Sequence, residues 1–477
     1  FFYFYGYILF QPSFRSRRSS YLAGLTPRVR RNASTMAAND PFFSDYAQAV
    51  TAFHDLVSNG SDGWRKQAIL HLEFCPHGRS DFLAWHRHYI SVFEKICGEL
   101  IGKPNFALAY WDWSSANGRL PRPFFIDGPL NVEFWQDEAN GSSPNWPGGT
   151  VRSSPTRGIA AGVGLQDDPR RGGSFTLNNI NRIKRLSRFN LFQGRLESSP
   201  HNNGHVVSGA GGGHIGNGMS PLDPAFWLHH CNIDRIWAEW QFDGNGTPNQ
   251  NRNYNGQFVD ARGNALTGEF TADNARNTAD LGFTYDTIQA APADANLEIS
   301  GLKELLQQPQ FASLEADFDL GPVELGASSS EQIAQPFVPT SSSVVSNEVV
   351  PALFSPRGFL TRNIESDFAT VGIEQGRILA KLSGIQAKGQ ITDVLTNVFV
   401  NCPYLSPETP FEDQHYADSF SFFMSPNMDH GDGHDGMRHN EVLVDITEPL
   451  RLQAGDGRID PEQIEVQLMS LPSSSET

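Results

Sequence analysis

Histidines are concentrated in one part of this 477-residue chain, and their placement constrains its fold more than any other feature. Ten of the 14 histidines lie between His54 and His230. Several stand at helical spacing beside apolar residues, so helix packing would bury their rings. A buried polar group without a partner costs roughly 1–3 kcal/mol, and a metal ion is one such partner for an imidazole. The sequence therefore predicts helices that gather histidines around metal.

The first histidine cluster runs into a well-marked helix. From Tyr89 to Leu100, apolar residues recur every three or four positions and form one stripe. His86 lies close to this stripe, whereas His88 points away from it. We expect His86 to face the interior.

Three further histidines precede this helix. His77 lies nine residues before the helix histidine and follows Cys75 by two. His54 lies 23 residues before His77, in another segment with a helical pattern, and His71 lies six before it. Taken singly, each is more often a hydrogen-bonded structural residue than a metal ligand.

The second cluster reads PHNNGHVV and then SPLDPAFWLHHCNIDRIWAEW. His201 and His205 are four residues apart, so on a helix they share a face and can bind one ion. Asn202 stands where zinc proteases of the HExxH type have glutamate, which disfavours a zinc hydrolase. Farther on, His230 lies on an apolar helical stripe, and His229 lies to one side of it.

Two triplets of imidazoles without carboxylates suit copper, zinc, iron or nickel, and they differ from the carboxylate-rich di-iron bundles. With the motif CPHGRSDFLAWHRHYISVFE, the second cluster resembles the type 3 copper proteins, which are tyrosinases, catechol oxidases and molluscan haemocyanins. The resemblance is strong over residues 40–320, weak beyond, and nearest to fungal-type tyrosinases with a Cys-x-His thioether.

This resemblance implies a copper-dependent polyphenol oxidase. Such an enzyme uses O₂ to oxidise o-diphenols to o-quinones, and tyrosinases also hydroxylate monophenols. Phenolic small molecules and O₂ are the expected partners. The alternatives are oxygen binding without turnover, as in haemocyanin, and a mononuclear zinc hydrolase that uses the HNNGH site.

The resemblance also assigns residues to two copper ions. It implies a thioether between Cys75 and His77, with a free buried cysteine as the alternative. The first copper ligand is open between His54 and His71, and the longer spacing of His54 favours it. The implied ligands are His54, His77 and His86 for copper A and His201, His205 and His230 for copper B.

Monophenol hydroxylation requires a base, and tyrosinases are thought to position a water for it with a glutamate and an asparagine. Glu197 and Asn202 match these two positions, although a capping role for Glu197 is equally open. Asn217 stands where the family often has a bulky gate, so access looks open. Asp112 and Asp234 are candidates to orient the ligands, and Asp234 is better explained as a structural partner of Arg235.

We expect a mainly α catalytic domain at residues 36–325, a four-helix bundle with long loops that carries the copper site. A Ser/Pro/Val-rich linker at 326–353 precedes a predicted C-terminal β-sandwich at 354–477. Apolar side chains of YADSFSFF, residues 416–423, can plug the copper site, so this domain is a possible lid. Residues 1–35 contain six arginines and no acid, and we expect an organelle-targeting or spurious segment.

The overall charge narrows the range of partners. The formal net charge is -17 and the pI about 5.2, which argues against nucleic acid and anionic membranes. No apolar run approaches the roughly 20 residues that a membrane span needs. Four scattered cysteines are too few for a disulfide framework, so the redox compartment and the cellular location stay open.

Overall fold

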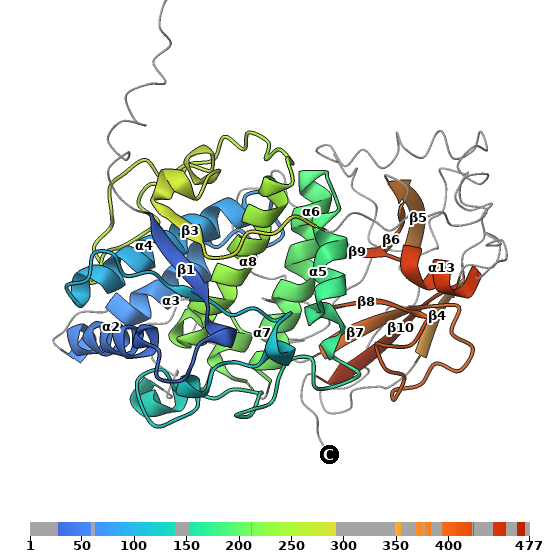
Figure 1. Cartoon of the computed structure of the whole chain (residues 1–477), viewed down its shortest axis with the longest axis horizontal. Helices are drawn as coiled ribbons and strands as arrows, with labels where there is room; N and C mark the ends of the chain where they lie inside the picture. Colours follow the sequence, from blue (N-terminus) through green and yellow to red (C-terminus); the bar gives the residue numbers. More distant parts are fainter. Residues whose placement is uncertain are drawn as a thin grey trace, which may run out of the picture.

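The computed structural model shows a helical part followed by a β-rich C-terminal part (Figure 1). The residues that it describes are 27–58, 63–138, 153–210, 212–291, 349–353, 369–374, 377–382, 394–421, 423, 442–454 and 465–472.

Helices form the core of the first part, as the sequence predicts. Those of this part are α2 (Pro41–Ser58), α3 (Gly63–Phe74), α4 (Phe82–Leu100), α5 (Leu177–Lys184), α6 (Phe189–Leu196), α7 (Asn202–Ser208) and α8 (Ala225–Phe242). The apolar stripes of α4 and α8 pack against each other, and the rings of Phe93 and Trp227 stack with centroids 3.4 Å apart. This packing fixes the histidines of both helices on neighbouring faces.

A small parallel sheet ties the N-terminal segment to this core. Strand β1 (Arg28–Asn32) lies between β2 (Ala109–Tyr110) and β3 (Phe283–Tyr285). Its Arg30 is fully buried and forms ion pairs with Glu94 at 2.8 Å and Asp234 at 3.3 Å. Residues 28–35, which the sequence analysis set apart from the fold, therefore belong to it. A targeting role for 1–26 lies outside the described residues.

The C-terminal part contains two antiparallel sheets and one helix among its described residues. The four-stranded sheet has the order β4 (Val349–Leu353), β10 (Glu465–Pro472), β7 (Val394–Val400), β8 (Tyr416–Ser421). The three-stranded sheet has the order β5 (Ala369–Glu374), β6 (Arg377–Leu382), β9 (Val442–Asp445), and α13 (Thr447–Ala454) follows it. The predicted strands are thus present, and a face-to-face sandwich stays a prediction. Because β4 is paired with β10, the sheet begins before the expected boundary at 354.

The two parts are in contact along β7 and β8, which lie beside α5, α6 and α7 (Figure 1). The side chain of Asn397 in β7 donates a hydrogen bond to the Arg170 carbonyl at 2.7 Å. Asn202 at the start of α7 donates to the carbonyl of Ser421 at 3.0 Å. The C-terminal part therefore docks on the helices that carry the second histidine cluster.

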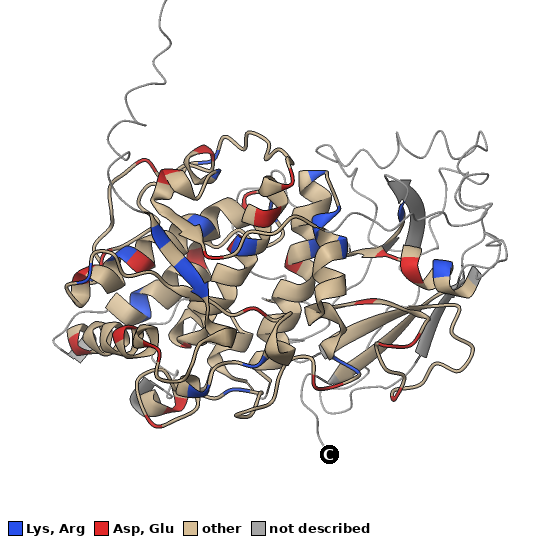
Figure 2. Cartoon of the chain, viewed as in Figure 1, with Lys and Arg blue, Asp and Glu red and all other residues tan. Residues whose placement is uncertain are grey.

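Charged residues are interspersed over the helical part, with acidic and basic side chains on the same helices (Figure 2). Within the described part of the chain, no helix combines the length and the hydropathy that crossing a bilayer requires.

Candidate metal centre

Three histidines from the first cluster form a nearly equilateral triangle. His71 lies in the last turn of α3, His77 in the following turn, and His86 in the first turns of α4. Their ring centroids are 5.3 Å apart for His71–His77, 5.6 Å for His71–His86 and 5.5 Å for His77–His86. This is the arrangement of three imidazoles that converge on one point.

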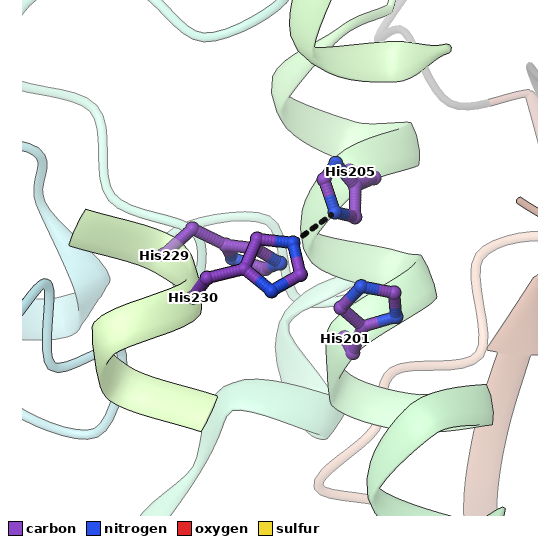
Figure 3. A group of neighbouring side chains, drawn as sticks. All are labelled: His201, His205, His229 and His230. Atoms are coloured by element: carbon purple, nitrogen blue, oxygen red, sulfur yellow. Dashed lines mark hydrogen bonds between the residues drawn. The ribbon is translucent and has the colours of Figure 1, made fainter. Parts of the chain in front are cut away.

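The second cluster forms a second triangle. His201 ends a π-helical turn (Glu197–His201), His205 lies in α7, and His230 comes from α8 on the opposite side (Figure 3). The centroid distances are 4.7 Å for His201–His205, 5.1 Å for His201–His230 and 5.4 Å for His205–His230. The i, i+4 spacing of the first two is what the sequence analysis expected of a shared helix face.

The two triangles lie against each other. The ring of His230 stacks on the ring of His86, with centroids 4.4 Å apart and planes 6° apart. His77 and His201 approach to 5.3 Å between centroids. Six imidazoles from five helical segments and one turn therefore form a single cluster.

Backbone carbonyls orient several of these rings through their Nδ1 atoms. A carbonyl can only accept, so Nδ1 carries the hydrogen and Nε2 keeps its lone pair. Within the described residues, the Nε2 atoms of His71, His86 and His201 have no hydrogen-bond partner although they are buried. The acceptors are the carbonyls of Gly218 for His71 (2.9 Å), Phe82 for His86 (2.8 Å) and Ile215 for His205 (2.7 Å).

The Nε2 atoms of His205 and His230 lie 3.3 Å apart (Figure 3). Two imidazole nitrogens bound to one ion at about 2.0–2.1 Å and a tetrahedral angle are separated by roughly 3.3–3.4 Å. Buried lone pairs at this spacing fit a metal ion, and the all-imidazole donor set suits copper or zinc.

Burial keeps the cluster neutral. It lowers the pKa of His71 to about 4 and that of His201 to about 3. Burial together with the neighbouring imidazoles holds the pKa values of His86, His205 and His230 well below the ordinary range. Neutral rings are the form that binds metal, so the site is ready for an ion at physiological pH.

His54 lies apart from the histidine triangle that it was expected to complete. Its ring stacks on Trp135, with centroids 3.4 Å apart and planes 5° apart, and packs 4.9 Å from Trp64. His71 occupies the place beside His77 and His86 instead. The missed signal is the spacing of His71 and Cys75, because Cys75 directly follows α3 and its N–H donates to the His71 carbonyl, which places the two residues one helical turn apart.

Cys75 approaches His77 as the thioether prediction requires. The Sγ of Cys75 lies 3.3 Å from Nδ1 of His77. The cysteine is buried, and burial raises the pKa of its thiol well above the usual range. The geometry is compatible with a bond between the two side chains, which stays a prediction.

Glu197 and Asn202 flank His201. Burial raises the pKa of Glu197 to about 8, and its Oε1 accepts a hydrogen bond of 2.6 Å from the backbone N–H of Gly78. Asn202 uses both ends of its amide, since Oδ1 accepts from Nδ1 of His201 at 2.9 Å and Nδ2 donates to Ser421. Glu197 is therefore anchored beside the turn of the first triangle, and Asn202 links the second triangle to β8.

His229 belongs to the cluster more closely than the sequence indicates. Its ring lies 4.5 Å from that of His205 and 5.5 Å from that of His201, and it is fully buried. A Cβ at Gly204 would lie 2.4 Å from the His229 ring, so glycine at this position leaves the space that the imidazole fills. In the sequence, the feature that could have indicated this contact is Gly204, the glycine before His205 in the HNNGH motif.

The two aspartates proposed to orient the ligands have structural partners instead. Asp234 pairs with Arg30 and with Arg87, and Tyr285 donates to it. The expected pair of Asp234 with Arg235 is replaced, because Arg235 binds Glu239 at 2.7 Å and faces Asp112 at 3.5 Å.

At the expected gate position, Asn217 donates a hydrogen bond to Ser153 at 3.1 Å and another to the Gly213 carbonyl at 3.1 Å. The cover over the cluster comes from elsewhere. Phe423, just beyond β8, is 3% exposed and contacts the rings of both triangles.

Comparisons with known proteins agree with this geometry. Residues 43–243 match the common central domain of tyrosinase. A tyrosinase from Streptomyces glaucescens is 32% identical over 247 residues, which are 45% of this chain and 82% of that protein. A chloroplastic polyphenol oxidase from Spinacia oleracea is 27% identical over 301 residues, or 54% of this chain and 47% of that one.

A chloroplastic (+)-larreatricin hydroxylase from Larrea tridentata is 27% identical over 250 residues. The matched part is 45% of this chain and 41% of the hydroxylase. The chain thus spans less than half of the length of these plant relatives.

Solved structures share the fold over most of the chain. A latent apple tyrosinase superposes with a TM-score of 0.52 at 17% identity, over 94% of this chain and 95% of that one. A latent aurone synthase, which is a polyphenol oxidase, gives a TM-score of 0.54 at 17% identity, over 94% of this chain and 86% of that one.

Proposed function

Because the chain belongs to the tyrosinase family of type 3 copper proteins, we propose that it is a polyphenol oxidase that converts o-diphenols to o-quinones with O₂. The observation that carries the proposal is the pair of facing imidazole triangles with inward Nε2 atoms. Zinc hydrolysis at the HNNGH site would need only the second triangle. The close contact of His86 with His230 supports a centre that uses both.

We assign His71, His77 and His86 to copper A, and His201, His205 and His230 to copper B. When bound, the copper pair would supply the two-electron chemistry that couples O₂ reduction to phenol oxidation. The chain supplies the rest: carbonyls fix the rings of His71, His86 and His205, and the buried aromatic walls exclude water.

We propose that the chain also hydroxylates monophenols. The carboxylate of Glu197 accepts a hydrogen bond from the N–H of Gly78, the residue that follows His77 of the first triangle. Its anchored carboxyl supports a role in handling the proton of a phenol at this site. The amide of Asn202 would take part only after its bond to Ser421 opens.

Phe423 supports a covered, low-activity state of the enzyme. Its aromatic ring stacks on His205 and also contacts His77 of the other triangle, so it covers the cluster from the side of the C-terminal part. The same cover also favours the second candidate, oxygen binding without turnover, because O₂ is far smaller than a phenol. Removing the cover separates the two functions.

The test uses the full chain expressed with copper. We expect two coppers per chain, and His86→Ala or His205→Ala should each remove one and abolish nearly all oxidation of catechol. His88→Gln is the matched control, since His88 donates to the Thr271 carbonyl at 2.8 Å and packs against aromatic rings outside the cluster. It should keep both ions.

Catechol, 4-tert-butylphenol and L-tyrosine are then assayed before and after limited proteolysis. One copper per chain, or zinc in place of copper in the histidine cluster, would overturn the binuclear proposal. Two coppers that bind O₂ but oxidise no phenol after the cover is removed would leave the oxygen-carrier function.

A further inference from the structure

A second group of metal-binding side chains lies in the C-terminal part, away from the histidine cluster. Cys402, Asp413 and His415 stand on the loop between β7 and β8, and their ligand atoms lie within 4.8 Å of one another. Cys402 and His415 are 1% and 6% exposed. The group therefore combines a buried thiol and a buried imidazole with a partly buried carboxylate.

The backbone around Cys402 is held in place. The side chain of Gln467 in β10 accepts from the Cys402 N–H at 2.7 Å and donates to its carbonyl at 3.0 Å. Asn401 adopts a left-handed conformation with φ of 52°, which turns the chain sharply after β7. The thiol is thus presented from a fixed position rather than from a loose loop.

Asp413 is held just as firmly. Its Oδ1 accepts from the backbone N–H of His415 at 2.9 Å and lies 2.8 Å from the ring Nδ1 of His415. The hydroxyl of Tyr404 donates to Oδ2 at 3.1 Å. These hydrogen bonds fix the carboxylate of Asp413 beside the imidazole of His415.

We propose that Cys402, Asp413 and His415 bind a single zinc ion. A sulfur, a nitrogen and an oxygen form the mixed set that a borderline divalent ion such as zinc accepts, and three protein ligands leave one position for water. The Nδ1 of His415 would exchange its bond to the carboxylate for a bond to the metal. Tyr404, which donates to Asp413, orients the carboxylate from outside.

The proposed zinc site lies far from the histidine cluster, so it would act on stability and not on catalysis. His415 directly precedes β8, and Phe423 follows the other end of that strand. Eight residues at about 3.3 Å each place the two residues roughly 26 Å apart, so the zinc would not touch the phenol oxidation centre. It would fasten the loop that joins β7 to β8 and stabilise the C-terminal part. The inference is independent of the oxidase proposal.

The alternative explanation is a purely structural group, in which Tyr404, Asp413 and His415 are hydrogen-bonded to one another beside a buried cysteine. Cys402 packs with Phe399, Met469 and Leu471, as a small apolar residue would. Zinc uptake distinguishes the two explanations. A metal site binds the ion and loses it when one of the three side chains is replaced, whereas a hydrogen-bonded group does not bind it at all.

The experiment uses the copper-loaded full chain, in which the histidine cluster is filled, dialysed against buffered free zinc. We expect one zinc per chain in addition to copper. Asp413→Asn and Cys402→Ala should abolish this uptake. Tyr404→Phe should weaken it by about 10- to 100-fold, as loss of an outer partner does. His88→Gln is the control and should bind zinc like the parent.

Zinc uptake that persists in Cys402→Ala would place the ion elsewhere, for instance on the histidines of 430–439, and would overturn the proposal. So would the absence of zinc uptake by the parent chain. Cobalt provides a second measurement: the parent should show the absorption of a cobalt–thiolate bond, and Cys402→Ser should lack it. Thermal unfolding without zinc checks that each variant is folded, so loss of binding is not mistaken for loss of structure.

Discussion

The ring of Phe423 lies nearly parallel to the ring of His205, with centroids 3.9 Å apart and planes inclined by 15°. It also meets the ring of His77 edge-on at 5.3 Å and that of His201 at 5.9 Å. One side chain from the C-terminal part therefore covers both imidazole triangles. If the chain oxidises phenols as proposed, this ring would have to move before a phenol could reach the centre.

Removal of this ring should activate the uncut chain. We expect Phe423→Ala to raise the rate of catechol oxidation by about tenfold or more, because only molecules with an uncovered centre are competent. Copper content should stay the same. Phe399→Ala is the matched control, since Phe399 is buried in the same part of the chain and its ring packs against Tyr416, away from the histidine cluster. An equal gain in the control, or none in Phe423→Ala, would show that the ring does not limit access.

A buried ion-pair group holds β8 on the helices, and loosening it should also activate the enzyme. Asp418 in β8 pairs with Arg195 of α6 and lies 3.5 Å from Arg182 of α5. Asp418→Asn removes one of the two carboxylates that face these arginines, the other being Asp445, and breaking a buried ion pair costs about 3–5 kcal/mol. We expect easier undocking, a higher rate on catechol and faster proteolysis within 326–348.

The control for this variant is Glu448→Gln in α13, which breaks an exposed pair with Arg451. An exposed pair contributes at most about 1 kcal/mol, so this change should affect neither rate. If Asp418→Asn unfolds the whole chain and loses copper, the C-terminal part is structural support rather than a lid.

The first copper ligand is settled by comparing two variants. His71→Ala should lose one copper and nearly all oxidation of catechol, because His71 completes the first triangle. His54→Ala should keep both ions and lose only stacking with Trp135. Elemental analysis of both variants decides the question, and the reverse result would return the role to His54.

The difference between these two histidines shows what the sequence can reveal. Helical spacing was enough to place His86 and His230, which lie on or close to apolar stripes, and His205, which lies four residues after His201. Spacing does not report how a chain reverses, and the turn between α3 and α4 is what brings His71 beside His86. The 23-residue separation from His77 favoured His54 as the first copper ligand. In the structure, however, the ring of His54 packs against Trp64 and Trp135.

Two other features were hidden for physical reasons. Strand β1 is short and rich in arginine, and nothing local shows that Arg30 would be buried between Glu94 and Asp234. The cover was foreseen as one of several apolar residues in 416–423. Only the docking of β8 on the helices singles out Phe423, because it decides which side chain reaches His205.

Glu197→Gln should separate the two phenol reactions. Glutamine keeps the size of the side chain and an oxygen that can accept from Gly78, so the fold should be preserved. If the carboxyl handles the proton of a monophenol, hydroxylation of 4-tert-butylphenol should fall by about 100-fold or more while catechol oxidation changes little. Steady-state rates on both substrates after removal of the cover provide the measurement. Equal losses on the two substrates would assign Glu197 a structural role.

The final prediction concerns the bond between Cys75 and His77. Their Sγ and Nδ1 atoms lie 3.3 Å apart in a buried turn, so a ring carbon next to that nitrogen is within reach of the sulfur. Bond formation removes the thiol hydrogen and one ring hydrogen, and O₂ at the copper-loaded site accepts the two electrons.

The intact mass of copper-matured protein should therefore be lower than the mass of the reduced sequence by two hydrogens. The tryptic peptide 67–79 contains both residues, so it should be lighter by two hydrogens, and its fragment ions should place the loss between Cys75 and His77. Protein matured without copper should keep the full mass, and after denaturation its Cys75 should react with an alkylating reagent. Cys97→Ala is the matched control, since it removes another buried cysteine and should leave the mass difference unchanged. Full alkylation of Cys75 in the copper-matured protein would show that the two side chains are only neighbours.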